Sequence, residues 1–262
     1  SGTSALLEIA RAMAQKRDTL GRSVLFLAFT GEERGLIGSR HFVANPTVPR
    51  ENIAAMINLD MVGRYDDKLL FVGGVATSPT FRALLKPRVE ATGLKHEFGD
   101  GGMAPSDNTS FYTAGIPVLF FFTGTHDDYH RPSDDIEKID LAGLSKVTSL
   151  AESMAVAICN LDERPKFTRA DRGGFGPKRA VMGIQIALTE GGVGIARVVP
   201  DGPAAKAGVQ HGDVVMEIDG KKTPDLRALR RALRNKKIGD ELTVKLLRGT
   251  ETIELKVKLG AG

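Results

Sequence analysis

Two adjacent acids, Glu32 and Glu33, stand on a glycine-flanked turn in the stretch TGEERGLIGS. Asp60 and His130, which can also bind metal or move protons, each follow an apolar run of the kind that forms a buried strand. Carboxylates and imidazole are the zinc ligands of hydrolytic sites. An acid beside a ligand acid can take the proton of a metal-activated water. Together the four residues predict the ligands and the general base of a hydrolytic zinc site.

Each of these residues, taken singly, also has a plainer interpretation. The acid pair can open the next helix, where negative charge favours the positive end of the helix dipole. Asp60 can cap a turn, and His130 can be a loop histidine without a task. The placement of all of them after strand ends favours a site, because ligands of open α/β sheets bind at the carboxyl ends of the strands.

The elements that position these side chains alternate between apolar strands and amphipathic helices. Strands are expected at residues 24–29, 52–60, 68–74 and 116–122. Helices are expected at residues 1–15, 36–43, 79–91 and 141–160. This order predicts an α/β fold, a three-layer α/β/α sandwich with a mixed sheet.

The charge of the chain is divided unevenly. Residues 1–163 carry 16 Lys and Arg against 21 Asp and Glu, whereas residues 164–262 carry 20 against 11. Such a division favours two domains, at 1–163 and 178–262. The basic stretch between them, 164–177, is rich in Gly and Pro and is typical of a solvated linker.

The cysteine count, the length of the apolar runs and the aromatic content exclude several classes of protein. One cysteine, Cys159, excludes an internal disulfide framework and a cysteine zinc knuckle. No apolar run approaches the roughly 20 residues of a membrane span, so none is expected. The basic linker has few interleaved aromatic residues, and no nucleic-acid partner is expected.

Four segments carry a family resemblance: TGEERGLIGS, INLDMVGR, SDNTSF and HDDYHRPSDDIEKID. Their order and spacing resemble those of the co-catalytic di-zinc aminopeptidases, to which glutaminyl cyclases and glutamate carboxypeptidases are related. The resemblance implies that Glu32 is the general base, that Glu33 and His130 bind one zinc ion, and that Asp60 binds the second. It also favours an extracytoplasmic compartment.

The resemblance implies two further ligands that these residues do not supply. Family members carry a His-x-Asp segment and a bridging Asp shortly before a Ser-Gly pair that Ser1-Gly2 resembles. We therefore expect the catalytic domain to be truncated at its N-terminus. Two zinc ions are expected in the intact enzyme, and weak or absent zinc in this chain, which we expect to be inactive by itself.

Asp107 and His126 are the candidates for the rest of the pocket. Many relatives have Ser-Asp-His where this sequence has Ser106-Asp107-Asn108. Asp107 is expected either to orient the substrate amine or a ligand, or to cap the helix that begins near Thr109. His126 is expected either to line the pocket or to be a solvated loop histidine.

The second segment contains GPAAKAGVQHGDVVMEIDGK and resembles a bacterial PDZ domain over roughly residues 178–260. Short strands and two helices, at 203–207 and 226–233, predict a small β-barrel-like fold. The resemblance makes residues 181–184 the carboxylate-binding loop, with Met182, Gly183, Ile184 and Gln185 as peptide-binding residues. Successive backbone N–H groups there can form a nest for a terminal carboxylate. A PDZ module that binds no peptide is the alternative.

These features predict a zinc-dependent aminopeptidase that removes N-terminal residues from peptides, with a PDZ module for C-terminal peptides or partners. Its expected partners are peptides with free N-termini and, at the PDZ module, free C-terminal peptides. One alternative is a catalytically dead peptide-binding or scaffold protein. A glutaminyl-cyclase-like acyltransferase is the other.

Overall fold

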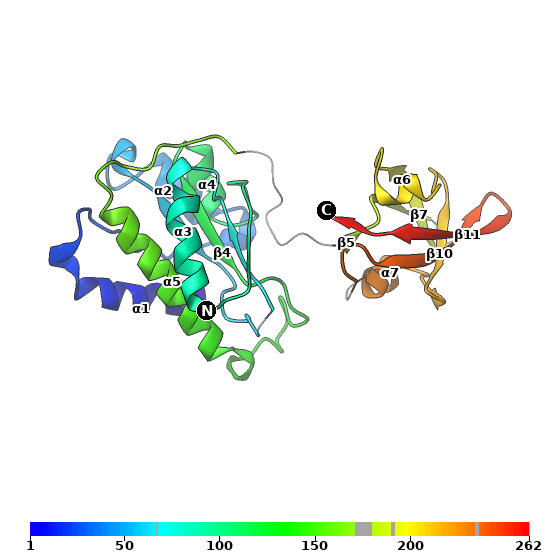
Figure 1. Cartoon of the computed structure of the whole chain (residues 1–262), viewed down its shortest axis with the longest axis horizontal. Coiled ribbons are helices and arrows are strands. Elements are labelled where there is room, and N and C mark those ends of the chain that lie inside the picture. The colour runs from blue at the N-terminus through cyan, green and yellow to red at the C-terminus, as the bar shows by residue number, and fades with distance from the viewer. Residues whose placement is uncertain (67, 171–179, 190–191, 234–235, 262) are drawn as a thin grey trace. The chain divides into compact units, whose positions relative to one another are not determined.

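The computed structural model describes residues 1–66, 68–170, 180–189, 192–233 and 236–261. The chain forms two compact units, Ser1–Pro177 and Lys178–Gly262 (Figure 1). Each unit has a buried apolar core of its own.

The first unit is built on a four-stranded mixed sheet in the order β1-β4-β2-β3. Its strands are β1 (Met56–Leu59), β2 (Leu70–Gly73), β3 (His96–Phe98) and β4 (Val118–Phe122). β1 pairs in parallel with β4, and β2 with β3, whereas β2 runs antiparallel to β4. The prediction of a mixed sheet is confirmed.

Helices cover both faces of this sheet (Figure 1). They are α1 (Gly2–Ala14), α2 (Ile37–Ala44), α3 (Pro79–Thr92), α4 (Asn108–Thr113) and α5 (Leu141–Cys159). Apolar side chains of α1, α3 and α5 share the main core with Leu119 and Phe121 of β4. Those of α2 and α4 share a second core with Val118 of the same strand. Because alternate strand residues face opposite sides, the two cores lie on opposite faces. The predicted three-layer sandwich is confirmed.

Local signals set the ends of the longer helices. α3 begins at Pro79, where the missing N–H costs no helical hydrogen bond, and stops at Gly93, which has a left-handed φ of 69°. α5 begins after Asp140, whose carboxylate accepts the N–H of Gly143 at 2.9 Å. These two helices frame the main core.

Helix α5 also has the length and composition of a membrane span, contrary to expectation. It has 19 residues and a mean hydropathy of 1.2 in its most apolar window. Its buried residues, among them Val147, Leu150 and Met154, pack in the main core. Cys159 at its end is free and buried, as expected of a small core residue.

The prediction of a strand at residues 24–29 is wrong, because this stretch forms no strand. Val24 packs against the main core, and Leu27 and Phe29 pack against the second core. Leu25 and Phe26 are 49% and 37% exposed. A strand requires a hydrogen-bonded neighbour, and β1, at the end of the described sheet, pairs with β4. An apolar sequence alone does not provide that neighbour.

The second unit is an antiparallel sheet with two short helices. Its main strands are ordered β11-β10-β8-β7-β6, and β9 pairs with β8. These strands are β6 (Ile184–Thr189), β7 (Gly192–Val198), β8 (Val214–Ile218), β9 (Lys221–Lys222), β10 (Glu241–Arg248) and β11 (Glu251–Lys258). A small separate pair joins β5 (Ala180–Val181) to β12 (Gly260–Ala261). Helices α6 (Pro203–Lys206) and α7 (Leu226–Leu233) confirm the two predicted helices.

The expected linker, 164–177, is only partly described, since 171–177 lie outside the described residues. Within the described part, residues 164 and 166–169 are exposed. Pro165 is buried, and Arg164 donates to the carbonyl oxygens of Glu51 and Ile53. A stretch without periodicity can still be held through backbone groups, which the sequence pattern does not display.

Candidate active site

The two acids lie on a turn whose shape depends on glycine. Glu32 and Glu33 belong to the 3-10 turn Glu32–Arg34, flanked by Gly31 and Gly35 with left-handed φ angles of 66° and 97°. Glycine adopts such angles without steric cost. The first turn of α2 holds no acid. The pair therefore opens a 3-10 turn and not the helix α2.

Glu33 and His130 come together from distant parts of the chain. The Nε2 atom of His130 lies 2.8 Å from Oε1 of Glu33. His130 has a left-handed φ of 56°, uncommon for a residue with a side chain. The ring of Tyr129 stacks on its imidazole with 3.8 Å between centroids. The structure thus brings together the two side chains expected to bind the first zinc ion.

Asp60 follows the C-terminal end of β1 and is held by a polar network. Its Oδ2 atom accepts a hydrogen bond from the Ser106 hydroxyl at 2.8 Å, and Nδ2 of Asn58 donates to the same hydroxyl oxygen at 2.7 Å. Burial raises the pKa of Asp60, the Ser106 bond opposes this, and the charge of Glu33 adds to the rise. The Ser106 hydroxyl therefore orients the Asp60 carboxylate.

Glu32 stands in a concentration of negative charge. Its pKa is raised to about 7, first by burial and then by the charges of Glu33, Asp60 and Asp107, while His130 opposes the rise. A carboxylate with a pKa near neutrality can both accept and return a proton at physiological pH. The chemistry open to Glu32 is therefore that of a general base and acid.

Asp107 precedes α4 and faces the same acidic cluster. Its side chain makes no capping hydrogen bond to that helix, so the capping interpretation is wrong. Burial raises its pKa, a hydrogen bond with Ser39 opposes this, and the charge of Asp60 adds to the rise. Its Oδ1 atom is buried without a hydrogen-bond partner. A buried oxygen of this kind is suited to a positive ligand.

His126 is buried rather than solvated. Its side chain is 8% exposed, and its Nε2 atom lies 3.7 Å from Oδ2 of Asp134. Its Nδ1 atom is buried without a hydrogen-bond partner. The interpretation as a solvated loop histidine is therefore wrong.

Sequence reasoning missed an ion-pair network that anchors the His130 loop. Arg64 pairs with Asp128 and with Asp134, each at 2.9 Å, and Lys138 pairs with Asp128 at 2.6 Å. Hydrogen bonds from Lys138, Ser133 and Arg64, in that order, hold the pKa of Asp128 well below its usual range. The mixed charges of the segment HDDYHRPSDDIEKID were the available signal for this network.

The predicted metal ligands do not gather around one point. Within the described ranges, no three His, Cys, Asp or Glu side chains come close enough to hold a metal ion together. Glu33 pairs with His130, whereas Asp60 accepts a hydrogen bond from Ser106. The unpartnered oxygen of Asp107 and the raised pKa values of Glu32, Asp60 and Asp107 indicate uncompensated negative charge. This donor set fits a cation.

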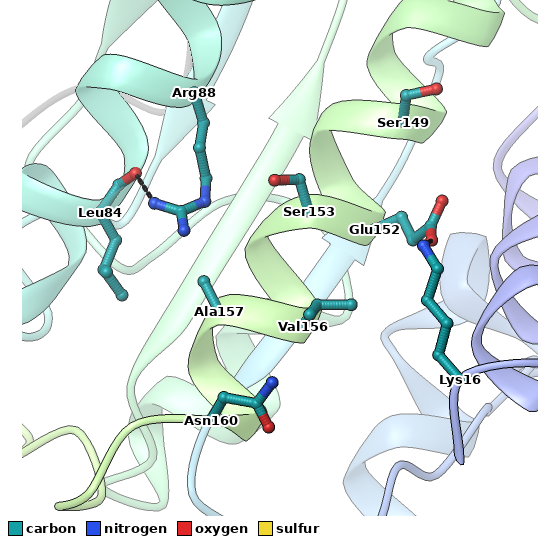
Figure 2. Close-up of a pocket in the computed structure, with 9 residues that line it drawn as sticks. All are labelled: Lys16, Leu84, Arg88, Ser149, Glu152, Ser153, Val156, Ala157 and Asn160. Carbon is teal, nitrogen blue, oxygen red and sulfur yellow. Dashed lines mark hydrogen bonds and ion pairs between the residues drawn. The ribbon is translucent and has the colours of Figure 1, made fainter. Parts of the chain in front are cut away.

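Two surface hollows of the first unit lie away from these residues. The one in Figure 2 has a volume of about 560 Å³ and is lined by residues of α3 and α5, with Lys16 at one side. Lys16 pairs with Glu152 at 2.6 Å there, and Arg88 donates to the carbonyl oxygen of Leu84 at 2.7 Å. The second hollow, of about 700 Å³, is lined by residues of 65–66 and 137–146. Neither is lined by a candidate site residue.

In the second unit, the predicted peptide-binding residues form a loop and the start of an edge strand. Gly183 has a left-handed φ of 76°, and a Cβ there would lie 3.1 Å from Cδ of Pro203. Met182 is buried, Ile184 packs on the core, and Gln185 is exposed. β6 is the terminal strand of its sheet, so its outer edge has no strand partner within the described residues. An open strand edge can accept an added strand.

Family comparison identifies both units of the chain. The model of peptidase family M28 matches residues 1–155, more than half of the chain. The chain belongs to this family. A PDZ-domain model matches residues 180–259.

Similar proteins include aminopeptidases. Leupeptin-inactivating enzyme 1 of Streptomyces exfoliatus is 31% identical over 146 residues, which are 53% of this chain and 31% of that protein. Aminopeptidase YwaD of Bacillus subtilis is 30% identical over 179 residues, 63% of this chain and 38% of that protein. The crystal structure of LapA of Legionella is similar with a TM-score of 0.54 and 26% identity, covering 61% of this chain and 47% of LapA. The chain thus spans less than half the length of these proteins.

Proposed function

We propose that the first unit belongs to a zinc-dependent aminopeptidase that removes N-terminal residues from peptides. The observation that carries this proposal is the acidic turn, where Glu33 meets His130 at 2.8 Å while Glu32, with a pKa of about 7, stands beside it. One acid is available to hold metal and its neighbour to handle a proton. Membership of peptidase family M28 and similarity to aminopeptidase YwaD support the same reaction.

In this proposal Glu33 and His130 hold the first zinc ion and Asp60 holds the second. Zinc supplies Lewis acidity toward the peptide carbonyl and lowers the pKa of water. A catalytic zinc ordinarily has three protein ligands, and the described residues offer two for one ion and one for the other. The 262-residue chain by itself should therefore bind zinc weakly and be inactive.

The side chains of the chain have separate tasks. Glu32 accepts the proton of the attacking water on its carboxylate and returns it to the leaving amine. Asp107, with its unpartnered Oδ1 atom, attracts the positively charged amine of a free peptide N-terminus. Ser106 keeps the Asp60 carboxylate in one orientation. A free N-terminus is thus the substrate feature that the acidic cluster favours.

We propose that the PDZ module binds peptides with free C-termini along the outer edge of β6. The amide groups around Met182 and Gly183 meet the carboxylate, and no Arg or Lys lies within residues 181–186 to do so. Arg227 and Arg231 of α7 are exposed and can attract acidic peptides at longer range. The module would bring peptides or partner proteins to the enzyme.

One observation favours a second candidate, a catalytically dead peptide-binding protein. Within the described residues the three expected ligands are divided two and one, without a complete metal centre. In such a protein the PDZ module alone would carry the function.

Substitution of each acid of the turn in the whole protein separates the candidates. Glu32→Gln keeps the size of the side chain but cannot accept a proton, so turnover of an aminoacyl chromogenic substrate should fall by roughly 10²- to 10⁴-fold with zinc content unchanged. Glu33→Gln should reduce zinc content, measured by atomic absorption. Glu90→Gln, at an exposed position of α3, is the matched control and should change neither.

Three results would contradict the proposed roles. Full activity of Glu32→Gln would show that Glu32 is not the general base. Equal zinc loss in Glu32→Gln and Glu33→Gln would show that the two acids do not have separate roles. A whole protein that releases no amino acid from any peptide with zinc present would favour the dead binding protein.

A further inference from the structure

Residues 164–170 form a segment that we call the strap. It follows helix α5 and packs back against the first unit. The N–H of Thr168 donates to the carbonyl oxygen of Thr77 at 2.8 Å. The N–H of Ala170 donates to the hydroxyl oxygen of Tyr112 at 2.8 Å, and the ring of Phe167 lies 5.5 Å from the Tyr112 ring. Backbone hydrogen bonds and an aromatic contact therefore hold the strap against the first unit.

The end of the strap holds the glycine-rich loop, residues 99–105, that leads to the acidic cluster. The carbonyl oxygen of Ala170 accepts the N–H of Gly102 at 3.2 Å. Gly102 is seated so closely that a Cβ would lie 2.2 Å from Cδ2 of Tyr112 and 2.7 Å from Cγ2 of Thr77. Tyr112 therefore contacts both the strap and the loop.

From Gly102 a continuous chain of hydrogen bonds runs to the candidate site. Its carbonyl oxygen accepts Nδ2 of buried Asn108 at 2.9 Å, and Oδ1 of Asn108 accepts Nδ2 of Asn58 at 3.3 Å. Asn58 also donates to Ser106, which donates to Asp60. Many relatives are expected to carry His at position 108. In this chain Asn108 links the loop to Asn58 of the sheet through its hydrogen bonds.

We propose that the strap is a positioning element of the active site and that Tyr112 and Ala170 are positioning residues. They hold the glycine-rich loop, and through it Asn108, Asn58 and Ser106, so that the Asp60 carboxylate keeps one orientation. The working part of the catalytic unit then extends through residue 170, beyond the matched family region that ends at 155. The metal-binding role of Asp60 rests on the proposed function, whereas the chain of hydrogen bonds does not.

The test uses the full 262-residue chain without metal and the variant Tyr112→Phe. This change removes the hydroxyl that Ala170 binds and keeps the ring. Hydrogen exchange of the backbone amides of residues 99–105 should become roughly fivefold faster, the effect of losing one hydrogen bond. The side-chain amide resonances of Asn58 and Asn108 in ¹⁵N–¹H spectra should move.

A matched control is available in the same unit. Tyr65 is also buried, and its hydroxyl accepts the N–H of Lys95 at 2.7 Å. Tyr65→Phe removes an equivalent bond, so it should cost similar stability but leave the loop and both Asn resonances unchanged. If Tyr112→Phe does not fold, Phe167→Ala replaces it, because Phe167 is 37% exposed, and the same shifts are expected.

The outcomes separate this inference from the proposed function. Identical loop exchange and Asn resonances in the strap variant and in Tyr65→Phe would overturn the positioning role. Failure of the whole protein to bind zinc would overturn the proposed function and leave the metal-free exchange result standing.

Discussion

Replacing Glu32 by glutamine should stabilise the metal-free chain at pH 8 and leave its stability unchanged at pH 4. The pKa of Glu32 is raised from its usual 4.5 to about 7, first by burial and then by three neighbouring acids. Between these two values the folded chain keeps a proton on Glu32 that the unfolded chain has released. The contribution of Glu32 to the free energy of unfolding is therefore fully present below pH 4.5, and it is lost as the pH rises through 7. Glutamine carries no charge at any pH, so it avoids the loss.

The size of the effect follows from the pKa and from solvent exposure. A rise from 4.5 to about 7 corresponds to about 3 kcal/mol in the absence of solvent screening. Glu32 is only half-buried, and screening of exposed charges reduces such energies severalfold. We therefore expect the variant to gain about 1 kcal/mol at pH 8.

Urea unfolding between pH 4 and 8, with a chelator present, measures this gain. The chain has no Trp and three Tyr residues, Tyr65, Tyr112 and Tyr129, all in the first unit. Tyrosine fluorescence therefore follows this unit alone, and the PDZ module does not obscure the transition. Glu90→Gln should follow the unmodified chain at every pH. An equal gain at pH 4 and pH 8, or a Glu32→Gln variant less stable at pH 8, would refute the argument.

The other predictions concern zinc and the peptide groove. Zinc added to the 262-residue chain should be lost on dialysis, because the described residues offer two ligands for one ion and one for the other; stoichiometric zinc with cleavage of an aminoacyl chromogenic substrate would contradict this. Gly183→Val should abolish binding of C-terminal peptides at any ionic strength, because φ is 76° and a Cβ would lie 3.1 Å from Pro203. Gly220→Val has the same backbone strain, with a φ of 74° and open space around it, and should still bind. Titration with free and amidated peptides checks this, and equal affinity for the two forms would mean that the groove does not read the carboxylate. Raising the salt concentration should weaken only the preference for acidic residues upstream of the peptide terminus.

Helices and most strands could be predicted because their signals are local. The apolar period of residues 141–160 and the proline and glycine around α3 mark their elements without reference to the rest of the chain. The stretch 24–29 had equally strong local signals and forms no strand. A strand depends on a partner that lies elsewhere in the chain, so its apolar residues could not determine the outcome.

The sequence could predict which residues belong to the candidate site, but not which of them contact each other. The acid pair, Asp60 and His130 were identified by their positions after apolar runs, yet only the fold shows that His130 meets Glu33 while Asp60 meets Ser106. Neither the capping role weighed for Asp107 nor the solvated state weighed for His126 survived. The absence of a hydrogen bond from its side chain to α4 decided the case of Asp107, and burial, which depends on the packing of distant segments, decided that of His126.

The sequence by itself determined the longer helices, most of the strands, the two-unit organisation and the acids and imidazole available for chemistry, because composition and periodicity act over a few residues. The tertiary structure alone decided which of these groups share an environment. It raised the pKa of Glu32, first by burying the side chain and then by placing three other carboxylates near it. It also joined Ala170 to Asp60 through groups distant in sequence. Electrostatic and hydrogen-bond energies depend on distance in space, and that distance is set only when the chain has folded.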